Sequence, residues 1–137
     1  MIQLVAELEI GDSIRFTGPL YGVSKWALYD LADLLLLPSY QENFGIVVGE
    51  ALSRGTPVLI SKGVNSWKRV ERWNAGIFVE PDVENLLIGM QQWNHMSQGE
   101  QREMGKQAVL CFQNEFTIER TIDTLRRVVH KTVLTNG

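Results

Sequence analysis

The stretch LLLLPSYQENFGIVVGEALSRGTPVLI, residues 34–60, decides the fold of this chain. It opens with an apolar run at 34–38 that is typical of a short strand buried on both faces of a parallel sheet. Apolar residues then dominate 45–54 and predict a helix, which Gly55 ends as a C′ glycine. The run at 56–61 predicts the next buried strand. Strand, loop, helix and strand thus follow one another with short connections.

The same alternation is present upstream of this stretch. Residues 3–12 are typical of the end of a helix, and the alternating run SIRFTG at 13–18 predicts a short strand. Residues 24–33 predict a helix with Ser24 as its N-cap. A strand and a helix therefore precede the buried strand at 34–38.

Downstream, one more helix and strand are followed only by helices. Residues 66–76 predict a helix and 77–80 a strand, and from the N-cap Asp82 onward the pattern is helical. Alternating strands and helices indicate βαβ units, so we expect an α/β fold with a doubly wound, Rossmann-like parallel sheet and C-terminal helices. A last helix is predicted after Thr117. Its apolar face consists of Ile118, Ile122, Leu125, Val129 and Val133.

The composition is that of a soluble globular protein. The chain has 137 residues, 45% hydrophobic and 21% charged, with a net charge of -3, so we expect one domain and no nucleic-acid partner. The single cysteine, Cys111, excludes an internal disulfide and favours a reducing, cytoplasmic setting. No run approaches the roughly 20 apolar residues that span a bilayer, and residues 1–12 lack the basic segment of a signal peptide.

Two glutamates, Glu42 and Glu50, lie in the deciding stretch with seven residues between them. Glu50 falls within the apolar arc of the predicted helix, and a buried carboxylate needs hydrogen-bond donors. Two sources of donors remain open: Arg54, four residues on, or the hydroxyl groups of a ligand. Glu42 follows the carboxyl end of a strand, where parallel sheets bind ligands, although a carboxylate there also complements the helix dipole.

The residues just after Glu42 suit a ligand that is rich in oxygen atoms. The amides of Asn43, Phe44 and Gly45 stand at the start of the helix, and a helix start beside a glycine receives phosphate or hydroxyl oxygens. The sequence contains no Asp-x-Asp pair and no histidine cluster. We therefore expect no metal site.

The string FTGPLYG…KWALY…ADLLLLPSYQENFGIVVGEALSRGTPVL resembles the donor-binding half of the retaining glycosyltransferases with two Rossmann-like domains. This is the GT-B fold of the glycogen-synthase and mannosyltransferase type, the glycosyl transferases group 1. The likeness is dense from Ser13 to Pro81. It rests on an acidic pair spaced like Glu42 and Glu50, set in a strand–loop–helix that ends in Gly-Thr-Pro.

The resemblance implies a role for each part of the site. Glu42 is the expected catalytic residue beside the transferred sugar, with the amides of Asn43, Phe44 and Gly45 next to the sugar and diphosphate. Glu50 is expected to accept hydrogen bonds from the two ribose hydroxyls of the nucleotide. The nucleotide-diphosphate sugar is a substrate, and no cofactor or metal is implied. The turn expected near the nucleotide base is Gly18, Pro19 and Leu20.

The resemblance also implies parts that precede residue 1. Two strands, a loop with a basic pair and an acceptor-binding domain are expected there, so we interpret 1–137 as a single partial domain with the first two strands missing. An N-terminal Rossmann-like domain, or a partner chain carrying it, would complete the enzyme, and the chain alone is expected to be inactive. The alternatives are a non-catalytic nucleotide- or sugar-binding or assembly module, and a plain doubly wound domain with an internal Glu50–Arg54 pair.

Two basic groups each allow more than one role. Lys62 either faces the diphosphate or belongs, with its neighbours, to a solvated helix face. The group near the C-terminus either complements the dipole of the last helix or makes a peripheral contact with the inner face of a membrane. The first group is Lys62, Lys68, Arg69 and Arg72, and the second is Arg126, Arg127, His130 and Lys131.

Overall fold

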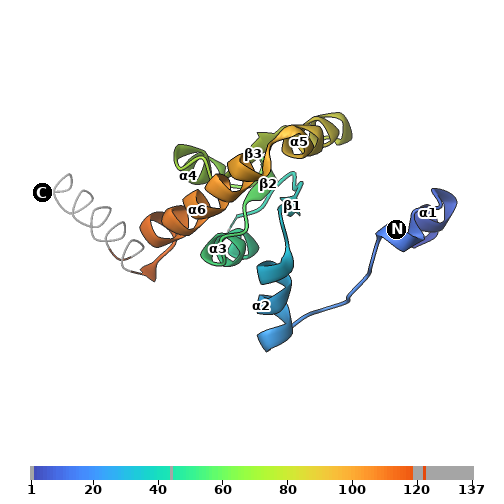
Figure 1. Cartoon of the computed structure of the whole chain (residues 1–137), viewed down its shortest axis with the longest axis horizontal. Helices are drawn as coiled ribbons and strands as arrows, with labels where there is room; N and C mark the ends of the chain where they lie inside the picture. Colours follow the sequence, from blue (N-terminus) through green and yellow to red (C-terminus); the bar gives the residue numbers. More distant parts are fainter. Residues whose placement is uncertain (1, 44, 119–121, 123–137) are drawn as a thin grey trace, which may run out of the picture.

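The computed structural model describes residues 2–43, 45–118 and 122. Its elements, in chain order, are α1 (Ile2–Glu7), the 3-10 helix η1 (Gly11–Ser13), α2 (Gly22–Leu31), β1 (Leu35–Leu37), α3 (Ile46–Ser53), β2 (Val58–Ser61), α4 (Trp67–Arg72), β3 (Gly76–Val79), α5 (Val83–His95) and α6 (Gln98–Glu115). Figure 1 shows α3 to α6 gathered around the strands, with α1 apart from them. Apart from Ile118 and Ile122, the helix predicted after Thr117 lies outside the described residues.

Three parallel strands form the centre of the molecule, in the order β1-β2-β3. Leu36 aligns with Leu59 between β1 and β2, and Ile60 aligns with Phe78 between β2 and β3. Every residue of β2 is buried, as expected for a central strand with helices on both faces. The predicted α/β class with a parallel sheet is therefore confirmed.

Alternate residues of β2 enter two different cores. Val58 and Ile60 pack with residues of α3, α4 and α6, among them the fully buried Leu52. Leu59 belongs to the other core, where it packs with Trp93 of α5. Because successive strand residues point to opposite faces, this division places helices on both sides of the sheet. The doubly wound arrangement agrees with the prediction.

Two predicted helix boundaries are confirmed by hydrogen bonds. Gly55 follows the C-cap of α3 with a φ of +77°, which glycine adopts without a steric penalty, and its amide donates to the carbonyl of Leu52 at 3.0 Å. Asp82 caps α5, because its Oδ1 accepts a hydrogen bond from the amide of Asn85 at 2.8 Å. These two residues fix where α3 ends and where α5 begins.

The strand predicted at 13–18 is wrong. Ser13 ends η1, and the chain then runs without regular structure to α2. The apolar residues of this run, Ile14 and Phe16, are 39% and 50% exposed. An alternating pattern forms a strand only where a neighbouring strand receives its backbone groups, and none of the three described strands pairs with this segment.

The predicted N-cap of the following helix is also wrong. The helix α2 begins at Gly22, two residues before Ser24, and its N-cap is Tyr21, which makes no side-chain capping bond. Gly22 has a φ of +54° and turns the chain into the helix earlier than the polar side chain indicated. Ser24 therefore lies inside the first turn of α2.

Candidate functional site

The loop between β1 and α3 is fastened to the loop between β2 and α4. The amide of Glu42 donates to the carbonyl of Gly63 at 3.1 Å, and the carbonyl of Glu42 accepts from the amide of Asn65 at 3.0 Å. These bonds make a parallel bridge between Glu42 and Val64, beyond the carboxyl ends of β1 and β2. The backbone of Glu42 is thereby held at the sheet edge where parallel α/β proteins bind ligands.

Gly63 allows the two loops to approach this closely. A Cβ atom at this position would collide with the carbonyl oxygens of Ser39 and Tyr40. The Oγ of Ser61 adds a further tie, since it donates to the carbonyl of Ser39. Because Gly63 has no side chain, the loop that contains Glu42 can pack directly against the chain at the end of β2.

Glu42 and Gly45 meet at the start of α3. Gly45 is the N-cap, with a left-handed φ of +50°, and its amide makes a long hydrogen bond of 3.4 Å to Oε1 of Glu42. Asn43 is exposed, and Phe44 lies outside the described residues. The start of α3 carries the positive end of the helix dipole, so an anion at this place meets a favourable field.

Glu50 lies on α3 and receives two hydrogen bonds from α2. The Nζ of Lys25 lies 2.6 Å from Oε1 of Glu50, and the hydroxyl of Tyr29 donates to Oε2 at 3.1 Å. The side chain of Glu50 is only 18% exposed. Two donors from one helix therefore offset the desolvation of this carboxylate.

The alternative pairing of Glu50 with Arg54 is wrong. Arg54 is the C-cap residue of α3, with φ of -97° and ψ of 3°, so it has left the helical register that would place it above Glu50. Its guanidinium instead makes two hydrogen bonds of 2.6 Å to the carboxylate of Asp30 on α2. These bonds lower the pKa of Asp30.

Tyr29 is kept protonated by its surroundings. Burial, then the hydrogen bond to Glu50 and the charge of Glu50, raise the pKa of Tyr29 from 10.0 to about 12. The phenol therefore remains a hydrogen-bond donor to Glu50 up to a higher pH than an ordinary tyrosine would. The sequence analysis missed both Lys25 and Tyr29, although their spacing of four residues places them on one face of a predicted helix.

The residues predicted to lie near the nucleotide base precede α2. Gly18, Pro19 and Leu20 belong to the irregular chain between η1 and α2. Gly18 has a φ of +65°, and Leu20 is half-buried whereas Pro19 is exposed. Their role beside a base stays a prediction.

Lys62 lies in the loop after β2 and pairs with an acidic residue. Its Nζ lies 2.7 Å from Oε1 of Glu80 and 5.9 Å from the ring centroid of Trp67. The hydrogen bond to Glu80 raises the pKa of Lys62, so the ammonium stays charged at neutral pH. Both side chains of the pair are about half exposed, at 45% and 54%, so water screens the pair and weakens it.

The other basic residues of this region connect α4 with neighbouring groups. The Nη1 of Arg72 lies 3.1 Å from Oε1 of Glu115 at the end of α6, and Arg69 donates to the carbonyl of Glu115 at 3.3 Å. The Nζ of Lys68 lies over the ring of Trp67, at 5.5 Å from its centroid. The interpretation of this basic group as a solvated helix face stays a prediction.

A groove of about 300 Å³ borders the carboxylate of Glu50. Its walls include Trp26 of α2, Ile46 of α3 and Phe116 after α6. Ile46 is 70% exposed and Trp26 is 37% exposed, so the groove opens to solvent. A ligand in this groove would meet a charged carboxylate between apolar walls.

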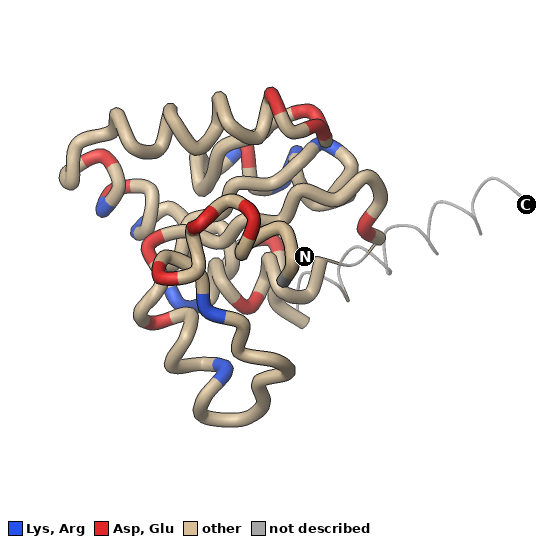
Figure 2. The backbone as a smooth tube through the Cα atoms, turned by 90° about the vertical axis from the view of Figure 1, so that its right-hand side faces the viewer, with Lys and Arg blue, Asp and Glu red and all other residues tan. Residues whose placement is uncertain are grey.

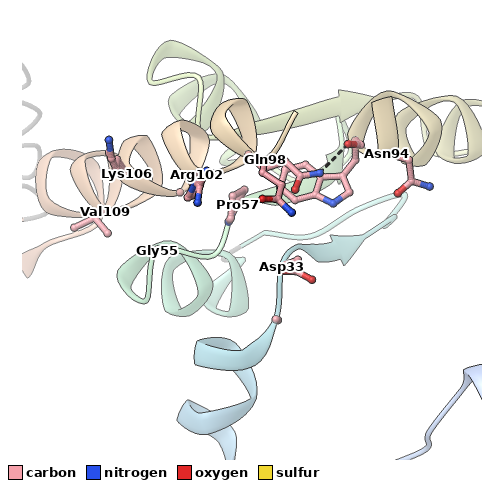
Figure 3. A pocket seen from close by; sticks show the side chains of 12 residues that line it. Asp33, Gly55, Pro57, Asn94, Gln98, Arg102, Lys106 and Val109 are labelled. Atoms are coloured by element: carbon pink, nitrogen blue, oxygen red, sulfur yellow. Dashed lines mark hydrogen bonds between the residues drawn. The ribbon is translucent and has the colours of Figure 1, made fainter. Parts of the chain in front are cut away.

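A wider hollow, of about 850 Å³, lies at the other ends of the strands. Figure 3 shows Gln98, Arg102 and Lys106 along α6 on one side of it, and Asp33 and Pro57 on the other. The last two residues come just before β1 and β2. Ligands of parallel α/β sheets bind at the carboxyl ends of the strands, so this hollow is not the candidate site.

The described part of the chain holds no group of three or more His, Cys, Asp or Glu side chains that could bind a metal ion. None of its helices is long and apolar enough to cross a membrane. Basic and acidic positions interleave along its backbone (Figure 2). The candidate site is thus built from two carboxylates, a helix start and nearby lysines.

The doubly wound parallel sheet, with one carboxylate at a helix start and a second on the same helix, agrees with the class of protein that the sequence resembles, a GT-B glycosyltransferase. The model of the family described as glycosyl transferases group 1 matches residues 1–110, and the chain belongs to this family. The resemblance drawn from the sequence is therefore confirmed. Family membership supports a glycosyltransferase over a non-catalytic binding module.

Curated relatives and solved structures agree with this family. The chain is 49% identical over 59 residues to D-inositol 3-phosphate glycosyltransferase of Salinispora arenicola, covering 43% of this chain and 13% of the relative. The Salinispora tropica protein of the same name is 45% identical over 73 residues, covering 52% and 15%. Sucrose-phosphate synthase from Thermosynechococcus elongatus has a TM-score of 0.79 at 27% identity, covering 99% of this chain and 34% of that one.

A glycosyltransferase from Rickettsia africae ESF-5 shares the fold, with a TM-score of 0.74 at 16% identity, covering 98% of this chain and 36% of that one. The chain thus spans about a third of the length of the solved structures. The matched segments span about a seventh of the curated relatives.

Proposed function

We propose that this chain is the donor-binding part of a retaining hexosyltransferase, which moves a hexose from a nucleotide-diphosphate sugar to a hydroxyl acceptor. The observation that carries the proposal is the placement of two carboxylates on one strand–loop–helix unit of a group 1 glycosyltransferase. Glu42 lies at the start of α3, beyond the carboxyl end of β1, and Glu50 lies on the same helix beside an open groove. The donor is a substrate, and the proposal includes no cofactor and no metal.

Each part of the donor has a proposed partner. Glu42 and the amides of 43–45 contact the transferred sugar and the diphosphate, where the start of α3 favours negative charge. Glu50 accepts hydrogen bonds from the two ribose hydroxyls, since a carboxylate has acceptor sites for both at once. The segment 18–20 borders the base.

Catalysis at such a site consists of positioning the donor and stabilising the charge that develops on the leaving diphosphate. The start of α3 supplies part of this stabilisation. Lys62, in the loop fastened to Glu42, is the cation that we propose turns from Glu80 to the diphosphate. The remaining cations and the acceptor site would come from an N-terminal Rossmann-like domain or a partner chain that carries it. On this proposal the chain alone is inactive.

Exposed apolar residues beside β1 support a partner on that side of the sheet. Among the described strands β1 pairs only with β2, so its other edge is open. Leu36 of β1 is 39% exposed, and Leu31 at the end of α2 is 83% exposed. Native proteins usually cover such an edge, and strands from the rest of the domain would do so here. The proposed setting is the cytoplasm, with at most a peripheral contact to the inner face of a membrane.

Isothermal titration calorimetry of the full chain with UDP and with GDP tests the proposal. We expect one of the two nucleotides to bind, and Glu50→Gln to weaken that binding on the order of tenfold, because hydrogen bonds to a charged acceptor are lost. The matched control is Glu103→Gln on the outer surface of α6, which should leave the affinity unchanged. Equal affinity in the Glu50→Gln variant and the native chain would contradict the ribose role.

A further inference from the structure

Two ion pairs connect α2 with α3, and they differ in what lies beside them. Asp30 and Arg54 pair through two hydrogen bonds of 2.6 Å, and both side chains are more than 40% exposed, at 44% and 43%. Lys25 and Glu50 pair at 2.6 Å, with side-chain exposures of 33% and 18%. Glu50 borders the groove next to α3, and Asp30 and Arg54 are not among its lining residues. The Asp30–Arg54 pair therefore only connects the two helices, whereas the Lys25–Glu50 pair includes a residue of the candidate site.

Lys25 is held in place on two sides. Its Nζ lies 2.6 Å from Oε1 of Glu50 and 4.8 Å from the ring centroid of Trp26. The ring of Trp26 in turn packs at a tilt against that of Tyr29, with 6.1 Å between the centroids. A flexible lysine side chain is thus confined between a carboxylate and an aromatic face, which fixes the direction from which it donates.

The two donors from α2 contact different oxygens of Glu50. Lys25 donates to Oε1 and Tyr29 donates to Oε2. An ionised carboxylate has about four lone-pair sites, two on each oxygen. One site on each oxygen is therefore taken by α2, and one on each oxygen remains. Two remaining acceptor sites on neighbouring oxygens match the two hydroxyls of a vicinal diol.

We propose that Lys25 and Tyr29 are positioning residues that hold the carboxylate of Glu50 so that both of its oxygens accept from the ribose diol of the donor. This inference rests on the proposed function, because it needs Glu50 to bind ribose. Neither residue touches the nucleotide in this arrangement. Each acts through Glu50 by preventing rotation of the carboxylate beside the apolar walls of the groove.

The affinity for a nucleotide that lacks the ribose diol distinguishes a loss of positioning of Glu50 from a general loss of stability. Titration calorimetry with the full chain compares UDP or GDP, whichever binds, with its 2′,3′-dideoxy form. The ratio of the two affinities measures what the hydroxyls contribute. We expect a ratio on the order of tenfold or more in the native chain, and a ratio near one in Lys25→Met. Lys25→Arg, which keeps a cationic donor, should restore most of the ratio.

Arg54→Met is the matched control, because it removes the other ion pair between the same two helices. It should lower the melting temperature about as much as Lys25→Met but leave the affinity ratio at its native value. Tyr29→Phe, which keeps the packing of the ring, should lower the ratio to between that of the native chain and that of Lys25→Met. If Lys25→Met does not fold, the affinity ratio of Tyr29→Phe tests the positioning role in its place.

Two failures are distinguishable in these data. A native chain that binds neither nucleotide, or binds the ribo and dideoxy forms equally, overturns the ribose role of Glu50 and with it this inference. A native chain that prefers the ribo form, with the same preference in Lys25→Met and Tyr29→Phe, overturns the positioning role alone.

Discussion

Glu50 shows how far a single side chain depends on residues that are distant in the sequence. Its place in the apolar arc of a helix could be read from the pattern of 45–54, and so could its need for donors. Its donors, Lys25 and Tyr29, are 25 and 21 residues away. Spacing along the helix indicated Arg54 instead, which fails because the helix ends at that residue. Contacts between helices depend on packing that spacing does not specify.

An alkaline titration tests the contact between Tyr29 and Glu50. The pKa of Tyr29 is raised from 10.0 to about 12, so the phenolate absorbance of this residue should develop around pH 12. Because the folded pKa lies above the unfolded value, the stability from this contact is complete below pH 10.0 and is lost as the pH rises through about 12. Ultraviolet difference spectra of the native chain follow this step.

Two variants serve as controls for that titration. Tyr29→Phe should remove the late absorbance step. Glu50→Gln should move the step to lower pH, because both the hydrogen bond to the carboxylate and its charge are lost. A step at the same pH in Glu50→Gln would mean that burial alone raises the pKa.

At the scale of elements, the sequence predicted best the segments with compact apolar runs, although β1, which was predicted to be buried on both faces, keeps Leu36 39% exposed. The elements β1, α3, β2 and β3 have short connections and compact apolar runs, and each was predicted within a few residues of its observed bounds. The run at 13–18 instead alternates apolar and polar residues, and it forms no strand. A strand needs a neighbour for its backbone, and that requirement is invisible in the run itself.

Gly63→Ala tests the contact between the two loops at the carboxyl ends of β1 and β2. A Cβ atom would collide with backbone carbonyls of the loop after β1, so the loops must separate and the bonds to the backbone of Glu42 must lengthen. We expect a loss of about 1–3 kcal/mol in the free energy of unfolding, as for other overpacked sites, together with weaker nucleotide binding. Urea denaturation and titration calorimetry measure the two effects.

Gly99→Ala provides the control for this substitution. Among the described residues, and apart from the neighbouring residues and the backbone of α6 itself, a Cβ at Gly99 would meet only the Oγ of Ser97 at 3.8 Å, so α6 has room for the methyl group. Its stability should stay the same or rise, because alanine favours the helix. If Gly63→Ala behaved like Gly99→Ala, the close packing of the loops would be disproved.

At the scale of the whole molecule, the class of fold could be predicted from the order of the elements. Which helices pack together in each of the two cores could not. Alternation of strands and helices predicts helices on both faces of a sheet. It does not predict that α6 crosses to pack on α3, where Gly105 comes so close that a Cβ would lie 2.9 Å from the carbonyl of Gly55. Such contacts join residues that lie 50 positions apart, and only the folded packing brings them together.

The reactivity of Cys111 reports on the integrity of the core between β2, α3, α4 and α6. Its thiol is fully buried on α6, and burial together with the charge of Glu115 raises its pKa to about 12. A disulfide reagent at pH 8 should therefore label the folded chain slowly, at a rate set by opening of the core, and label it rapidly in urea. Fast labelling of the folded chain in buffer would show that α6 separates readily from α3 and α4.

The bridge between Glu42 and the loop after β2 orders the backbone of Glu42 in the absence of a ligand. A carboxylate whose backbone is already ordered loses little conformational freedom when a ligand arrives, so the loop is preorganised. The same bridge makes Gly63 and Asn65 share in the orientation of Glu42 although they follow a different strand. If Glu42 contacts the transferred sugar as proposed, substitutions after β2 are expected to alter the preference for the sugar while the acidic motif itself stays intact.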